Sequence, residues 1–193
     1  MFESDFIDLF SRTHWSVVPI MWVPVSLLML GYGAFRTPAG ALLTLSLAAA
    51  GFISWTLTEY WLHRLFFHWQ PAGKIGERMH FLVHGVHHQW PKDKYRLVMP
   101  PAVSITLYFV FLAVFYPLFG PERVWGFHAG FVLGYVFYDC SHYWLHHYNP
   151  KSKYGLRLKK NHMIHHFEDH DSRFCVSNML WDRVFGTLGD RKL

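Results

Sequence analysis

Four long stretches of this chain carry no charged side chain, and they restrict the possible folds more than any other feature. The first runs from Trp15 to Phe35, and the others begin at Ala41, Val98 and Val124. A helix of about 20 apolar residues crosses the roughly 30 Å hydrocarbon core of a bilayer. We therefore predict an all-α integral membrane protein with four transmembrane helices, at about residues 15–35, 41–62, 98–119 and 124–146.

The composition agrees with a membrane location. Hydrophobic residues make up 52% of the 193 residues and charged residues only 16%, whereas about a quarter of the residues of a soluble domain are charged. Proline and glycine separate the apolar runs at residues 38–40 and 120–121. The net charge of +5 does not follow one helix face, so we expect no nucleic-acid partner. The two cysteines are too few for a disulfide framework.

Lysine and arginine lie almost entirely on one side of the predicted spans. Arg36 and Arg123 occupy two short loops on one side, and all the others fall on the opposite side. Because positively charged segments stay in the cytoplasm, we expect both termini to be cytoplasmic, in a bacterial inner membrane or the endoplasmic reticulum. The chain then forms one membrane domain, residues 1–193, with a cytosolic helical cap from residues 63–97 and 147–193. Residues 1–14 are amphipathic and are expected to lie in the interface.

Ten of the fifteen histidines fall into four clusters near the cytoplasmic ends of the predicted spans. Their spacings are H-x4-H, H-x2-HH, H-x3-H and H-x2-HH, and their members are His63 and His68; His84, His87 and His88; His142 and His146; and His162, His165 and His166. Imidazole is the commonest nitrogen ligand of zinc, iron and copper. Ten ligands are too many for one tetrahedral zinc, so the clusters predict a dinuclear centre with about five histidines for each metal.

Helical geometry predicts how the clusters present their rings. His84, His87 and His88 stand at i, i+3 and i+4, and we expect them to lie on one helix face. A five-residue step rotates a side chain by about 140° beyond one full turn, so His63 and His68 diverge on an undistorted α-helix. Either the helix ends between them or each serves a different metal.

Acidic residues near the clusters are candidates for orienting the ligands. Glu59 and Asp139 precede His63 and His142 within apolar helices, where ionisable groups are costly and usually functional. We expect each to accept the free ring N–H of a ligand histidine and so fix its tautomer; the alternative is that they reach the headgroups. The same role is expected near His165 for three further acidic residues, Glu168, Asp169 and Asp171.

Five histidines lie outside the four clusters. His80, His147 and His170 each neighbour a cluster, and we expect them to pack around the ligands rather than bind metal. His14 and His128 are isolated in the sequence, and such lone histidines usually have a packing role.

Three longer strings carry a resemblance to a known family. They are LVHGVHHQWPKDKYRLVMPP at residues 82–101, GYVFYDCSHYWLHH at residues 134–147 and KKNHMIHHFEDHDSRFCVSNMLWDRVFGT at residues 159–187. Together with the histidine spacing, they resemble the fatty acid hydroxylase superfamily, which includes sterol desaturases, and within it the fatty acid 2-hydroxylase branch. The resemblance extends from about Trp55 to the C-terminus. Cys175 stands where that branch usually has glycine, so the loop there is expected to be arranged differently.

The resemblance implies a membrane-embedded oxidoreductase that uses O2 to hydroxylate a fatty acyl chain at C2, either free or in a ceramide-like sphingolipid. It implies two iron ions held by the ten clustered histidines, with zinc able to replace iron in purified protein. Eukaryotic members usually carry an N-terminal haem domain that these 193 residues do not contain. The resemblance therefore implies a separate electron-transfer protein, of the cytochrome b5 or ferredoxin type.

Two alternative functions remain open at this stage. One is hydroxylation or desaturation of a sterol or carotenoid by the same kind of centre. The other is a non-catalytic membrane metal-binding protein, such as a zinc carrier. A carrier is expected to place its ligands near the bilayer midplane, whereas these clusters lie at the ends of the predicted spans, so the positions of the ligands favour an enzyme.

Overall fold

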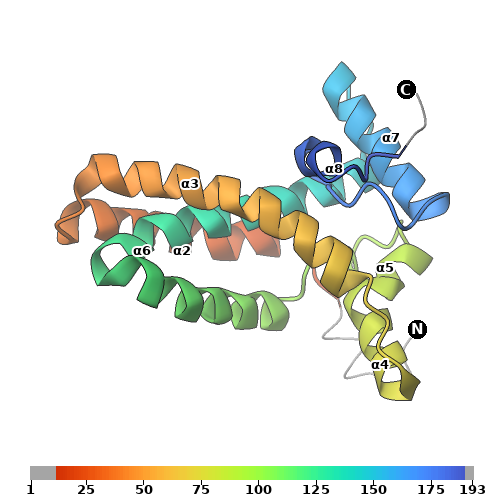
Figure 1. Cartoon of the computed structure of the whole chain (residues 1–193), viewed down its shortest axis with the longest axis horizontal. Coiled ribbons are helices and arrows are strands. Elements are labelled where there is room, and N and C mark those ends of the chain that lie inside the picture. The colour runs from red at the N-terminus through yellow and green to blue at the C-terminus, as the bar shows by residue number, and fades with distance from the viewer. Residues whose placement is uncertain (1–11, 190–193) are drawn as a thin grey trace.

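The computed structural model describes residues 12–189, and every regular element in that range is helical (Figure 1). The interfacial stretch predicted at residues 1–14 falls mostly outside the described residues. The helices are α2 (Val17–Arg36), α3 (Gly40–Trp61), the π-helix η1 (Leu62–Phe67), α4 (Gly73–His80), the π-helix η2 (Phe81–Gly85), α5 (Val86–Gln89), α6 (Pro101–His147), α7 (Lys153–Phe167) and α8 (Leu180–Val184).

Three helical stretches of the described residues are long and apolar enough to cross a membrane: Val17–Arg36, Gly40–Phe67 and Pro101–His147. Their outward faces carry large apolar side chains, such as Phe35 and Leu42, each with 83% of its surface exposed. Such faces suit contact with lipid rather than water. The prediction of an all-α membrane protein is therefore confirmed, although the structure gives three long helices where four spans were predicted.

The difference arises inside α6, which reverses direction at Gly120. This residue has φ 71° and ψ 171°, a backbone conformation that glycine adopts readily because it has no Cβ. The two halves of α6 then run side by side, as Figure 1 shows. Aromatic rings confirm the pairing, since Phe115 lies 4.9 Å from Phe127 and Phe111 lies 4.7 Å from Phe131 between ring centroids. The predicted break at residues 120–121 is thus present as a tight reversal.

The second half of α6 is the centre of the bundle. Its residues are mostly buried, and α3 packs against it at very short range. A Cβ placed on Gly130 would overlap the backbone carbonyl of Ala48 in α3. Close approach of backbones through small residues is typical of helices that pack within membranes, so this contact fixes α3 and α6 as one rigid pair.

The two ends of the bundle differ. At one end the loop after α2 touches the start of the second half of α6, where the Thr37 hydroxyl donates to the carbonyl of Glu122 at 3.1 Å. Arg36 and Arg123 therefore lie at the same end, as predicted. The shorter helices α4, α5, α7 and α8 gather at the opposite end (Figure 1). These helices bring together the histidine-rich segments.

Candidate metal centre

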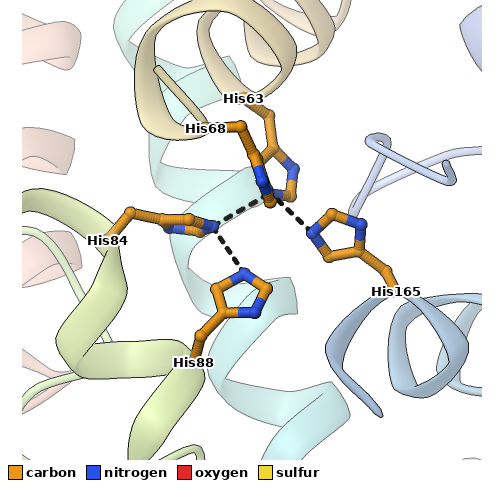
Figure 2. A group of neighbouring side chains, drawn as sticks. All are labelled: His63, His68, His84, His88 and His165. Atoms are coloured by element: carbon orange, nitrogen blue, oxygen red, sulfur yellow. Dashed lines mark hydrogen bonds between the residues drawn. The ribbon is translucent and has the colours of Figure 1, made fainter. Parts of the chain in front are cut away.

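The ten clustered histidines converge into two groups of five. Within each group, one ligand atom from every ring lies within 4.8 Å of all the others. The first histidine group contains His63, His68, His84, His88 and His165 (Figure 2), and the second contains His87, His142, His146, His162 and His166. The structure thus assembles all ten residues that the sequence indicated, in the two sets of five expected for two metals.

A π-helix brings His63 and His68 onto one face. In η1 the His68 backbone N–H donates to the His63 carbonyl at 3.3 Å, an i to i+5 bond that widens the turn. The two ring centroids lie 5.0 Å apart, and both rings belong to the first group. The idea that each serves a different metal was therefore wrong, because the helix is distorted between them rather than simply ended.

Each H-x2-HH cluster contributes to both groups. His84 and His88, four residues apart, join the first group, while His87 joins the second. In the later cluster, His162 and His166 join the second group and His165 joins the first. Adjacent residues on a helix point about 100° apart, so the prediction that all three rings of a cluster lie on one helix face was only partly correct. Each of these clusters lies between the two groups and contributes rings to both.

Ring nitrogens of the first group face one another (Figure 2). The Nε2 atoms of His63 and His84 lie 3.1 Å apart, and those of His84 and His88 lie 2.8 Å apart. The Nε2 atoms of His68 and His165 are separated by 3.0 Å. A neutral imidazole has only one N–H, so a set of five rings turned toward a common centre presents several lone pairs there. A cation accepts such lone pairs.

The second group shows the same convergence. Nε2 of His87 lies 3.1 Å from Nε2 of His166, and Nε2 of His146 lies 2.7 Å from Nε2 of His162. Nε2 of His142 is buried and has no hydrogen-bond partner among the described residues. Buried polar atoms are normally paired, so this orphaned nitrogen is itself a sign of a site for a ligand.

The two groups adjoin. The ring of His88 from the first group stacks on the ring of His166 from the second, with centroids 4.2 Å apart. His87 also contacts His84 and His88 across the boundary, at 6.0 Å in each case. Two cations held in these groups would therefore form a dinuclear centre.

Burial keeps the imidazoles in the form that binds metal. It lowers the pKa of His68 to about 3, of His88 to about 2 and of His165 to about 4, against an ordinary value of 6.5. Repulsion from the neighbouring His165 contributes further for His68 and His88. Metal ligation requires a neutral imidazole. Five neutral nitrogen donors with no carboxylate among them fit zinc or iron, both of which imidazole suits.

Comparison with known proteins agrees with this geometry. The sequence model of the fatty acid hydroxylase family matches residues 48–187, which include all ten grouped histidines. This chain belongs to the fatty acid hydroxylase family. The matched range begins within α3 and extends beyond α8, so it covers most of the second apolar segment, the later ones and all of the grouped histidines.

Several relatives of this hydroxylase have names that describe a reaction. A dihydroceramide fatty acyl 2-hydroxylase of Arabidopsis thaliana is 39% identical over 187 residues, which cover 97% of this chain and 78% of the relative. A ceramide very long chain fatty acid hydroxylase of Schizosaccharomyces pombe is also 39% identical, over 96% of this chain and 54% of the relative. The chain thus spans about half the length of some relatives and more of others.

A solved structure confirms the fold of the hydroxylase. The structure of full-length scs7p, in which only the hydroxylase domain is visible, superposes with a TM-score of 0.89 at 38% sequence identity. The match covers 95% of this chain and 69% of that chain. At this identity the likeness extends beyond topology to the sequence of the matched region.

The predicted role of the two intramembrane acids was wrong. Asp139 accepts hydrogen bonds from the backbone N–H of Met99 at 3.0 Å and from the hydroxyl of Tyr135 at 2.9 Å. Glu59 accepts from the backbone N–H groups of Val176 and Ser177, at 2.7 and 2.8 Å. Neither carboxyl group bonds to a histidine. Each instead accepts backbone N–H groups of a chain segment that crosses the end of its helix.

Backbone carbonyls take the place that the sequence had assigned to acids. Nδ1 of His63 lies 2.5 Å from the Phe174 carbonyl, and Nδ1 of His165 lies 2.7 Å from the Ser172 carbonyl. If Nδ1 carries the proton in each bond, Nε2 presents its lone pair to the group. Sequence reasoning missed these partners, since any residue has a carbonyl. Of the acids predicted near His165, Asp169 pairs with Arg173 at 3.6 Å instead.

The three supporting histidines lie around the groups rather than within them. The ring of His170 is 5.2 Å from that of His88, and the ring of His147 packs on Tyr143 at 4.4 Å. His80 is half-buried on α4, next to the first turn of η2. Of the isolated histidines, His128 is buried between α6 halves against Tyr108 and His14 is exposed.

Proposed function

We propose that this protein is a membrane-embedded monooxygenase that places a hydroxyl group on C2 of a fatty acyl chain, carried by a ceramide-like sphingolipid or free. Two adjoining groups of five neutral histidines, at one end of an apolar helical bundle in a fatty acid hydroxylase, carry this proposal. The substrate class follows the names of the relatives, among them a fatty acid 2-hydroxylase of Mus musculus that is 40% identical over 97% of this chain.

The reaction fixes what else is needed. An acyl methylene, O2, two electrons and two protons give the 2-hydroxy acyl chain and one molecule of water. The described residues contain no group that could supply the electrons, so a separate electron-transfer protein of the cytochrome b5 or ferredoxin type completes the balance. Two iron ions held by the histidine groups would supply the activation of O2.

The residues of the chain have three tasks in this reaction. The imidazoles bind the two ions without adding negative charge, since burial keeps them neutral, as for His68 and His88. The helices η1, η2, α5, α6 and α7 hold the rings in two adjoining sets. The position at the end of the apolar bundle brings carbons close to a lipid headgroup, rather than mid-chain carbons, within reach.

The membrane arrangement is part of the proposal. We infer four crossings, since the 47 residues of α6 are about twice the length that one crossing requires and the chain reverses at Gly120. The excess of Lys and Arg at the histidine-rich end supports a cytoplasmic cap and cytoplasmic termini. Either the endoplasmic reticulum or a bacterial inner membrane would satisfy this arrangement.

Lipid analysis of an expressing host tests the function. The chain is expressed with an electron-donor system in cells that make sphingolipids, and the lipids are examined by mass spectrometry. We expect 2-hydroxy acyl chains to accumulate, to disappear in His87→Ala and to persist in the control His14→Ala, whose side chain is exposed and outside both groups. Oxygenated sterols or carotenoids would support the same centre with another substrate. Two bound metals with no oxygenated lipid would support a non-catalytic metal-binding protein.

A further inference from the structure

A short segment, residues 172–177, runs beside the first histidine group and presents two carbonyls to it. We call this segment the carbonyl strap. The carbonyls of Ser172 and Phe174 are the partners of His165 Nδ1 and His63 Nδ1. The strap is buried along its whole length, so water does not compete for these two carbonyls. In the second group, by contrast, Nδ1 of His87, His162 and His166 has no hydrogen-bond partner among residues 12–189.

Two buried carboxyl groups hold the strap from its other side. Asp182 of α8 accepts from the backbone N–H groups of Phe174 and Cys175, at 2.9 and 3.0 Å. Glu59 of α3 accepts from the next two N–H groups, those of Val176 and Ser177. Four consecutive backbone donors of the strap are therefore satisfied by two acids, each with about 1% of its surface exposed.

The strap needs such anchors because its backbone is strained. Arg173 has φ 58°, in the left-handed region that residues with a Cβ seldom adopt. It lies between the two carbonyls that meet the histidines. Its own N–H donates to the Thr187 carbonyl at 2.8 Å, and its side chain is buried. A strained conformation persists only where its surroundings over-determine it, and here the surroundings are Glu59, Asp182 and Thr187.

We propose that Glu59 and Asp182 are positioning residues for the first histidine group alone, acting through the carbonyl strap on His63 and His165. Loss of either anchor releases the strap, frees the two rings to rotate or change tautomer, and weakens metal binding in the first group. The second group does not contact the strap's carbonyls and keeps its metal. The inference rests on the proposed function only in that both groups hold a metal ion.

The two anchors respond differently to replacement by the matching amide. In Glu59→Gln the amide oxygen can accept both backbone N–H groups that Oε1 accepts, while the amide NH2 faces the Ser177 hydroxyl, which turns from donor to acceptor. In Asp182→Asn one backbone N–H meets the amide NH2 whichever way the amide is turned, because each carboxyl oxygen accepts one N–H. The proposal thus requires Glu59→Gln to keep zinc binding in the first group and Asp182→Asn to weaken it.

Release of zinc into a competing chelator measures the effect on the purified full chain loaded with Zn²⁺. Second-sphere changes typically weaken metal affinity by about 10–100-fold. We expect Asp182→Asn and Glu59→Leu to release one of two zinc ions faster by about that factor, and Glu59→Gln to match the unaltered protein. Circular dichroism and gel filtration in detergent establish whether each variant is folded. If Glu59→Leu does not fold, the nearly isosteric Asp182→Asn still provides the test.

Combination with ligand variants identifies which ion is lost. In His146→Ala only the first group is complete, and adding Asp182→Asn should speed release of the remaining zinc by the same factor. In His68→Ala only the second group is complete, and adding Asp182→Asn should change nothing. Equal retention of both ions in Asp182→Asn, or equal loss from both groups in a folded variant, overturns the inference. Failure of the unaltered protein to bind two zinc ions would instead count against the proposed function.

Discussion

The two histidine groups are built from the same parts and held in different ways. Each consists of two pairs, each pair taken from one cluster, and one ring from an H-x2-HH cluster whose other two rings serve the opposite group. In the second group both pairs, His142 with His146 and His162 with His166, are four residues apart on α6 and α7. In the first group one pair, His63 with His68, is five apart and needs the π-helix η1 to share a face.

Their surroundings differ accordingly. The second group takes two of its rings, His142 and His146, from the last two turns of α6, the helix at the centre of the bundle, so bundle packing positions them. The first group takes its rings from shorter elements of the cap and is fixed by the carbonyl strap. The comparison indicates that one group inherits its rigidity from the bundle, whereas the other depends on hydrogen bonds that single substitutions can remove.

Removal of a ligand should have the largest effect, and the same effect in both groups. We expect His68→Ala and His146→Ala each to bind one metal ion rather than two and to lose at least about 100-fold in hydroxylation, since a lost ligand costs no less than a lost ligand partner. Elemental analysis and lipid mass spectrometry measure the two outcomes. Two tightly bound ions in either variant would show that the groups are not separate sites.

A change in the length of η1 should affect the first group only. One alanine inserted between Leu65 and Phe66 turns His68 by about 100° and should abolish binding of one metal ion. Deletion of Phe66 is expected to be milder, because a four-residue step on an α-helix faces the same way as a five-residue step on a π-helix. Metal stoichiometry of the two variants provides the test, and equal loss in both would contradict this account of the π-helix.

Acid should destabilise the metal-free protein. The pKa values of His68, His88 and His165 are about 3, 2 and 4 in the folded chain and close to 6.5 when unfolded. The unfolded chain therefore binds more protons between these limits, and stability is lost as pH falls below about 6.5. Thermal unfolding in detergent should show a lower Tm at pH 5 than at pH 7 after chelation. A Tm that rises on acidification would contradict the burial of these rings.

The smallest effect on metal binding is expected at Asp139, which resembles Glu59 in burial but holds no part of the strap. Asp139→Leu leaves the Met99 N–H and the Tyr135 hydroxyl without an acceptor, at a cost of about 1–3 kcal/mol each. We expect reduced stability with both zinc ions retained, as measured by thermal unfolding and elemental analysis. Loss of one ion at the rate seen for Asp182→Asn would mean that Asp139 also orients a ligand.

Much of this architecture can be predicted from the sequence, because the patterns that indicate it lie within single segments. Uncharged runs of about 20 residues indicate α2 and α3, and glycine followed by proline at 120–121 marks the reversal within α6. Histidine spacing identified all ten grouped residues. These features depend on helix geometry and hydrophobicity within one segment, so no knowledge of the remaining fold was required.

The rest depends on contacts between distant segments. Glu59 lies one turn from His63 in the sequence, yet its partners are Val176 and Ser177, more than a hundred residues away. The π-helix at η1 depends on backbone bonding that an α-helical period does not predict. His87 and His88 belong to different groups because α5 lies between the two groups. None of these arrangements leaves a pattern in the chain.

Anomalous X-ray diffraction at the zinc absorption edge, from crystals of the purified zinc-loaded protein, tests the central claim most directly. The account predicts two peaks, one surrounded by His63, His68, His84, His88 and His165 and the other by His87, His142, His146, His162 and His166. A single peak, or a peak bound by Glu59 or Asp139 in place of these rings, would contradict it.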